Sequence, residues 1–206
     1  MWQSVIVICI THLFFIDRGP KWLFYTSKPL PTLLMFTALF SANAFDNPFG
    51  LWVMVGLLLS ALGDLFLMHP KDKFIAGLSC FLLVHIAYSI GFFQAFQQMS
   101  WWILAGFIAT GILTFLLLLP NLGSMALPVG AYIIVIAMMA STAAGFWLTY
   151  HNTPALLALT GALMFILSDL VLAIDRFRSS SHFSQHVIMV TYYSAQGLIT
   201  LSVLSS

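Results

Sequence analysis

Two aspartates lie inside long apolar stretches, where an ionisable side chain is costly. Asp64 follows the apolar residues 51–63, and Asp169 follows the apolar residues 161–168. The other four aspartates of the chain fall in polar segments between apolar runs. Ionisable groups within membrane-spanning helices normally face the interior of the bundle and mark function. We therefore predict that Asp64 and Asp169 are catalytic; the alternative is a structural pair whose members satisfy each other.

Two carboxyl groups brought together in a low-dielectric interior cannot both ionise easily. One would hold a proton and serve as a general acid, while the other would remain a carboxylate and serve as a base. This chemistry needs no metal, and we predict none. The sequence lacks a Gly-x-Ser-x-Gly elbow and a glycine-rich phosphate loop, which disfavours serine-hydrolase and nucleotide chemistry.

Further polar residues in the apolar stretches could orient the aspartates or the substrate. His85 and Tyr88 lie three residues apart, on one face of a helix, and Tyr193 and Gln196 repeat this spacing. Lys28 precedes the second apolar run, where it could bind a phosphate group. The alternative for the uncharged members is ordinary hydrogen bonding between helices, which is the more common role of such residues in membranes.

The composition requires a membrane to surround these residues. Of 206 residues, 61% are hydrophobic and 6% are charged, and the mean hydropathy is +1.02. Soluble domains carry about 25% charged residues. Spanning helices need about 20 apolar residues, and continuous apolar runs exclude the alternating strands of an outer-membrane barrel. We predict an all-α polytopic bundle, a single domain over 1–206, with eight spans at about 2–16, 30–45, 49–68, 74–97, 101–119, 125–148, 154–174 and 185–204.

The basic residues predict the orientation of the bundle. With eight spans, all seven fall in the first, third and seventh connections: Arg18, Lys21, Lys28, Lys71, Lys73, Arg176 and Arg178. The positive-inside rule makes that face cytoplasmic and places both termini outside. Asp64 and Asp169 then lie roughly 7 Å below the cytoplasmic edge, and His12 lies at a similar depth. The site is expected to open toward the cytoplasm.

The chain also contains a possible internal repeat. Asp64 and Asp169 are 105 residues apart, and so are Tyr88 and Tyr193 (169 − 64 and 193 − 88). Two parallel halves of four helices would each supply an aspartate and a tyrosine.

At these residues the chain resembles the lysoplasmalogenase-like (YhhN-type) family of membrane proteins. The resemblance rests on ordered blocks: Lys28-Pro29, residues 60–68 around Asp64, residues 74–77, Phe81 with His85 and Tyr88, residues 128–132 ending in Tyr132, Gly161 with Phe165, Ser168 and Asp169, and Tyr192-Tyr193 with Ala195 and Gln196.

The resemblance implies eight spans and hydrolysis of the vinyl ether bond of lysoplasmalogens. The products would be a fatty aldehyde and glycerophosphoethanolamine or glycerophosphocholine, formed without a metal or organic cofactor. It implies roles for Asp64 and Asp169 in acid–base catalysis, and it adds Tyr132 to the orienting residues. The substrate would be a lysophospholipid. Separately from the resemblance, the compact size and short connections of the chain favour a bacterial inner membrane as its location.

Two other functions share these features. A small-molecule or lipid transporter also uses intramembrane aspartates and repeats, and a lipid-binding protein without catalysis would keep the pocket. Both aspartates near one face, rather than at the midplane, favour the enzyme. The net charge of +1 gives no reason to expect a nucleic-acid partner, and the oligomeric state stays open.

Overall fold

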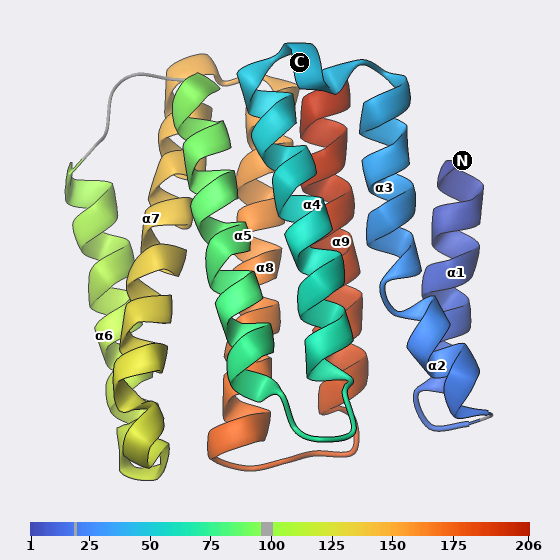
Figure 1. Cartoon of the computed structure of the whole chain (residues 1–206). Helices are drawn as coiled ribbons and strands as arrows, with labels where there is room; N and C mark the ends of the chain where they lie inside the picture. The colour runs from blue at the N-terminus through green and yellow to red at the C-terminus, as the bar shows by residue number, and fades with distance from the viewer. Residues whose placement is uncertain (19, 96–100) are drawn as a thin grey trace.

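The computed structural model describes residues 1–18, 20–95 and 101–206, and all regular structure in those residues is helical. The predicted all-α class is therefore confirmed. The elements, shown in Figure 1, are α1 (Trp2–Phe15), α2 (Lys21–Ser27), α3 (Leu30–Ser41), η1 (Ala44–Asp46), α4 (Pro48–Leu67), α5 (Phe74–Ala95), α6 (Trp101–Leu122), η2 (Gly123–Met125), α7 (Ala126–Tyr150), α8 (Thr153–Phe177) and α9 (Ser184–Leu204).

Asparagine–proline signals start two of the helices that carry the site. The Asn47 side chain accepts a hydrogen bond from the Phe49 amide at the start of α4, and Asn152 accepts one from Ala155 at the start of α8. Such caps satisfy amides that have no partner within the helix. Each asparagine is followed by a proline in the first turn, where proline is tolerated because its missing N–H would be unpaired there anyway.

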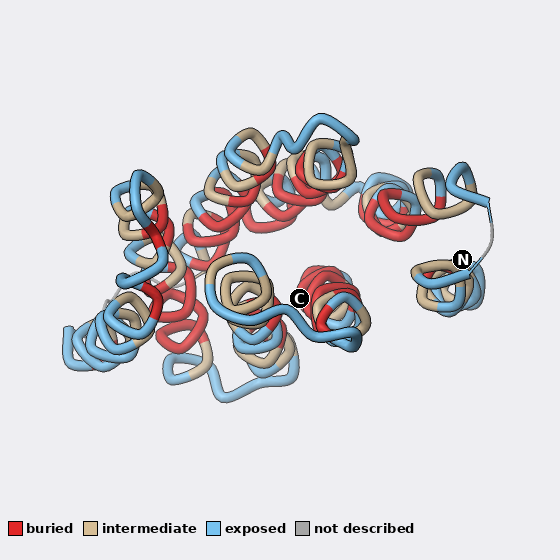
Figure 2. The backbone as a smooth tube through the Cα atoms, turned by 90° about the horizontal axis from the view of Figure 1, so that it is seen from below, coloured by how far each residue is buried: buried red, intermediate tan, exposed pale blue. Residues whose placement is uncertain are grey.

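The helices form two rows with a hairpin at one end. Seen along the bundle, α5, α4 and α3 lie in one row, and α8, α9 and α1 lie opposite (Figure 2). The α7 helix contacts both α5 and α8 and closes one end, and α6 packs outside it. Buried residues face the space between the rows, so α4, α5, α8 and α9 surround the core.

Five stretches of the described chain are long and apolar enough to cross a membrane. They are α4, α5, α8, α9 and the 50-residue stretch Trp101–Tyr150, which combines α6, η2 and α7. The helices α1 and α3 have only 14 and 12 residues, against the roughly 20 that a full span requires. The chain is a helical membrane protein, and the count of eight spans stays a prediction.

Several helix limits differ from the sequence-based expectations; α3, for example, ends at Ser41 rather than near residue 45. The segment Lys21–Ser27, which we expected to connect two spans, forms the short helix α2. The α6 helix continues through Pro120 to Leu122, although a proline at this position removes one backbone hydrogen bond of the helix. The turn begins instead at Gly123, whose φ of 51° favours glycine. The predicted end of the 74–97 span, at residues 96 and 97, lies outside the described residues.

The connections that carry the basic residues lie at one end of the bundle. The α1–α2, α4–α5 and α8–α9 connections are all at the lower end in Figure 1, and both termini point to the upper end. This arrangement fits the segregation of charge found in the sequence. Which side of a membrane each end faces stays a prediction of the positive-inside rule.

Two helical hairpins contribute the aspartates. The α4 helix pairs with α5, and α8 pairs with α9. The α4 helix begins at Pro48 and α8 begins at Thr153, again 105 residues later (153 − 48). The shared offset agrees with the proposed repeat, and a duplication of the chain stays a prediction.

Candidate active site

Asp64 lies near the lower end of α4 and is almost fully buried. Its residue exposure is 1%. The Tyr192 hydroxyl of α9 donates a hydrogen bond of 2.9 Å to its Oδ2, and the Lys28 Nζ lies 3.8 Å from its Oδ1. A buried carboxylate is tolerated when a cation and hydrogen-bond donors compensate its charge. Lys28 and Tyr192 provide both, and each of these contacts stabilises the ionised form of Asp64.

Asp169 of α8 has a different set of partners. The Tyr132 hydroxyl of α7 donates a 3.0 Å hydrogen bond to its Oδ2. The Nε2 of His85, on α5, lies 3.1 Å from the same oxygen. The His85 side chain is completely buried, and that of Asp169 is 10% exposed. Each aspartate therefore has its own tyrosine and its own basic side chain, drawn from different helices.

A backbone carbonyl of α5 determines which ring nitrogen of His85 carries a proton. Its Nδ1 lies 2.6 Å from the Phe81 carbonyl oxygen. A carbonyl oxygen only accepts hydrogen bonds, so Nδ1 is assigned the proton. Nε2 is not aligned for a hydrogen bond with any group in the described chain, although it is within ion-pairing distance of Asp169. Two lone pairs would repel at this distance, so a proton on either His85 Nε2 or Asp169 Oδ2 would stabilise the contact.

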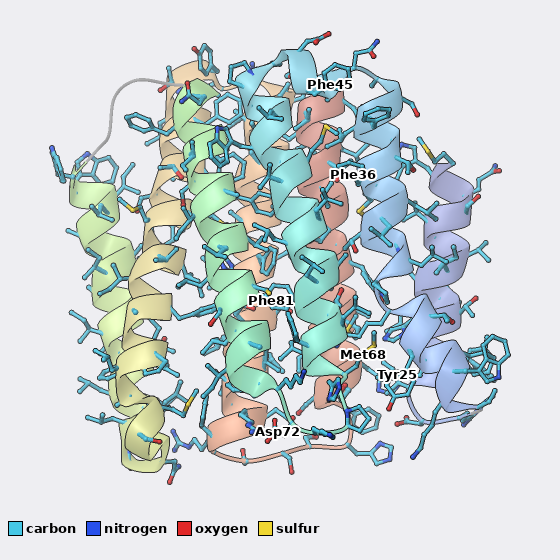
Figure 3. All side chains as sticks on the ribbon, viewed as in Figure 1. Tyr25, Phe36, Phe45, Met68, Asp72 and Phe81 are labelled. Atoms are coloured by element: carbon cyan, nitrogen blue, oxygen red, sulfur yellow. The ribbon has the colours of Figure 1, made fainter. Side chains whose placement is uncertain are left out.

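The two aspartates line one polar cavity of about 290 Å³. Lys28, Ser168 and Tyr192 also line it. The cavity lies at the lower end of the bundle, at the level of the labelled side chains of Met68, Asp72 and Phe81 in Figure 3. The sequence-based prediction placed both carboxylates in one layer, and a shared cavity agrees with it.

An ion pair lies at the exposed mouth of this cavity. The Arg176 guanidinium donates a 2.7 Å hydrogen bond to Asp72, linking the end of α8 to the α4–α5 connection. That bond holds the pKa of Asp72 below its usual range. The same guanidinium lies 4.7 Å from the centre of the Phe74 ring. The mouth therefore presents a cation on an aromatic surface, beside a carboxylate.

The remaining predicted residues lie behind the cavity rather than in its wall. The Tyr88 hydroxyl donates to Gln196, whose Nε2 donates to the Ser60 hydroxyl at 2.8 Å. This network joins α5, α9 and α4 one turn above Asp64. The Tyr193 hydroxyl donates to the backbone carbonyl of Lys28 at 2.9 Å. Tyr88, Gln196 and Tyr193 thus support the helices that carry Asp64 and Lys28, and their hydrogen bonds do not run to the aspartates.

His12, expected at the depth of the aspartates, lies in a separate contact. Its Nδ1 is 2.9 Å from the Ser27 hydroxyl, and its ring packs edge-on against Tyr193. Since Ser27 donates its own proton to the Leu23 carbonyl, His12 is the donor in this pair. The histidine connects α1 to α2 and α9.

The Tyr88 network depends on a close approach that only glycine allows. A Cβ on Gly56 would lie 2.1 Å from the Tyr88 Cε1. We expect Gly56→Ala to displace this ring and to lower the stability of the protein in detergent by about 2 kcal/mol, the usual range for overpacking. Thermal unfolding followed by circular dichroism would measure the change.

Gly106→Ala is the matched control for this substitution. An added Cβ at Gly106 would meet nothing within 4 Å. Its stability should stay within about 1 kcal/mol of the original, with any gain arising from helix propensity. Equal melting temperatures for the two variants would contradict the role assigned to Gly56.

Sequence reasoning missed Tyr192 and the groups at the mouth. It selected Tyr193 for its spacing from Tyr88, yet Met189, Tyr192, Tyr193 and Gln196 follow the i, i+3, i+4, i+7 pattern of one helix face. That pattern could have included Tyr192. Arg176 was noted only as a topology signal.

The donor groups present do not resemble a metal site. Within the described residues, no three His, Cys, Asp or Glu side chains gather in a way that could hold a metal ion. The cavity instead offers two carboxyl groups in unlike surroundings, one beside an ammonium group and one beside an imidazole. Such a difference suits a division into base and acid.

Apolar helices around buried charged groups define an integral membrane protein with a helical bundle. The model of the YhhN family matches residues 23–203. The chain belongs to the YhhN family.

Its relatives include proteins with a named activity. The chain is 34% identical over 200 residues to lysoplasmalogenase TMEM86A of Bos taurus, covering 92% of this chain and 82% of that protein. It is 37% identical over 156 residues to human lysoplasmalogenase TMEM86B, covering 73% and 62%. It is 26% identical over 206 residues to the uncharacterized membrane protein YhhN of Escherichia coli O157:H7, covering 98% and 99%. No solved structure matches the chain significantly.

Proposed function

We propose that this protein is a membrane hydrolase that cleaves the vinyl ether bond of lysoplasmalogens. The products are a fatty aldehyde and glycerophosphoethanolamine or glycerophosphocholine. The observation that carries the proposal is the cavity lined by two aspartates, one beside an ammonium group and the other beside an imidazole. The similarity to two lysoplasmalogenases supports the reaction class.

In the proposed first step, the His85–Asp169 pair protonates the substrate. A vinyl ether takes a proton at the carbon distal to oxygen, and its π electrons form the new C–H bond. This leaves an oxocarbenium ion. A proton shared by His85 and Asp169, whose Nε2 and Oδ2 atoms lie 3.1 Å apart, would be the one transferred. The Tyr132 hydroxyl donates to Asp169 and would stabilise the carboxylate that the transfer leaves behind.

In the second step, Asp64 stabilises the cation and activates water. Its carboxylate, whose ionised form Lys28 and Tyr192 stabilise, faces the same cavity. An anion in a low-dielectric site stabilises a developing positive charge strongly. Water adds to the oxocarbenium carbon and gives up a proton, which forms a hemiacetal. Asp64, which took the proton from water, passes it to the glycerol oxygen as the hemiacetal C–O bond breaks, and the hemiacetal hydroxyl gives its proton to the His85–Asp169 pair. The aldehyde and the glycerol hydroxyl form, and both aspartates regain their starting states.

The cations of the cavity fit a phosphate headgroup. Lys28 Nζ is 3.8 Å from Asp64, a loose pair that leaves ammonium protons free for a second anion. Arg176 at the mouth can bind a phosphate through paired N–H donors. Asp72, its present partner, would then be close to the positive amine of the headgroup.

The experiment is release of aldehyde from lysoplasmenylethanolamine and lysoplasmenylcholine by purified protein in detergent, with and without a chelator. We expect release that the chelator does not reduce, because the proposed steps use only side chains. Absence of aldehyde from both lipids with a correctly folded protein would overturn the proposal. Movement of unaltered lipid across sealed vesicles would favour the transporter instead.

A further inference from the structure

A second cavity, which we call the chain cavity, adjoins the polar one. It has a volume of about 140 Å³ and lies among α6, α7 and α8, with the start of α5 at its lower end. Three residues line both cavities: Phe74, Asp169 and Leu172. The Asp169 carboxyl group therefore stands at the border between a polar space and an apolar one.

The wall of the chain cavity is hydrocarbon along most of its length. Half of its α6 and α7 lining residues are Phe, Leu, Ile or Val, and Gly111 and Ala137 add no polar side chain. The two threonines in the lining, Thr110 and Thr114, donate their hydroxyl protons to carbonyls of their own helix. Apolar cavities of about 150 Å³ in proteins stay free of water and bind hydrocarbon groups. The occupant expected here is likewise a hydrocarbon.

The chain cavity is elongated along the helices. Its lining on α6 runs from Phe107 to Leu118, and on α7 from Val129 to Ala137. At 1.5 Å per residue these stretches measure about 16 Å and about 12 Å. The lower part contains Tyr132, which donates to Asp169, and the far end includes Ile136 and Ala137. A linear chain fits this shape better than a compact group does.

We propose that the chain cavity holds the alkenyl chain of the lysolipid and that its far end, at Ile136, sets the preferred chain length. This inference rests on the proposed function. In a lysoplasmalogen the vinyl ether bond joins the polar glycerophosphate part to the hydrocarbon chain. With the headgroup in the polar cavity and the chain in the apolar one, that bond lies beside Asp169.

The proposal predicts opposite changes for two substitutions at one position. Ile136→Trp shortens the chain cavity, so kcat/KM for a hexadecenyl lysolipid should fall by about tenfold or more relative to an octenyl lysolipid, the effect of about two methylene groups left unburied. Ile136→Ala lengthens the cavity and should shift the preference toward longer chains. The measurement is aldehyde release over a series of alkenyl chain lengths.

Ile134→Trp is the matched control, because Ile134 is 61% exposed on the outer face of the same helix and does not line the chain cavity. Its chain-length profile should equal that of the unmodified protein. If Ile136→Trp is too unstable to assay, Ile136→Ala still decides the matter. An active unmodified protein with the same profile in both Ile136 variants would overturn this inference alone. An unmodified protein that releases no aldehyde from any chain length would overturn the proposed function, and this inference with it.

Discussion

Asp169→Asn should lower kcat/KM for lysoplasmenylethanolamine by about a thousandfold, within the range for loss of a general acid. Asparagine keeps the shape of aspartate and can still accept the Tyr132 hydrogen bond. It cannot share a transferable proton with His85, 3.1 Å away. The chemical step should therefore fail while lysolipid binding and the melting temperature remain close to those of the original protein. Aldehyde release and lipid binding, measured in the same detergent, would distinguish a loss of the chemical step from a loss of binding.

Asp46→Asn provides the control for this loss. Asp46 lies in η1, at the opposite end of the bundle from the site, and the same replacement of aspartate by asparagine is made there. The Asp46→Asn variant should retain the activity of the original protein. If Asp169→Asn kept more than half of the activity, the proton donor would have to be another group.

Lys28→Met should have the largest effect on stability, a loss of about 3 kcal/mol, because it removes the cation beside a buried carboxylate. Asp64 is 1% exposed, so bulk solvent compensates its charge poorly once the ammonium group 3.8 Å away is removed. The carboxylate would have to remain uncompensated or take up a proton. In either case the base is lost, and we expect aldehyde release to fall together with the melting temperature.

The double variant Lys28→Met with Asp64→Asn tests this explanation. Removing the carboxylate as well leaves no buried charge, so the double variant should melt at a higher temperature than Lys28→Met alone while remaining inactive. Such non-additivity is the signature of residues in direct contact. Additive losses of stability would show that Lys28 acts through packing rather than through Asp64.

The sequence was informative about the aspartates because burying an ionisable group in an apolar helix carries a large free-energy penalty. Asp64 and Asp169 stand out against their neighbours for that reason, and they share a cavity in the structure. The spacing argument that chose Tyr88 and Tyr193 was less informative. It compared positions along the chain, whereas the tyrosine nearest each aspartate comes from a helix far away in sequence: Tyr192 for Asp64 and Tyr132 for Asp169.

The helix limits also fall into two groups, those that the local sequence predicts and those that it does not. Asparagine–proline signals before α4 and α8 are local, so the sequence located those starts closely. The helix α2 and the continuation of α6 through Pro120 were missed. In each of those cases the local residues are compatible with more than one conformation.

By itself, then, the sequence determined an apolar helical protein, the clustering of positive charge in certain connections and the identity of two costly carboxyl groups. Each of these follows from the free energy of placing a residue type in hydrocarbon or in water, which depends on composition and local order. Only the tertiary structure decided that Lys28 compensates Asp64, that His85 faces Asp169, and that Asp169 borders an apolar cavity. Those relations depend on the packing of α4, α5, α7, α8 and α9 against one another, and the distances across helices are set by side-chain shape rather than by spacing along the chain.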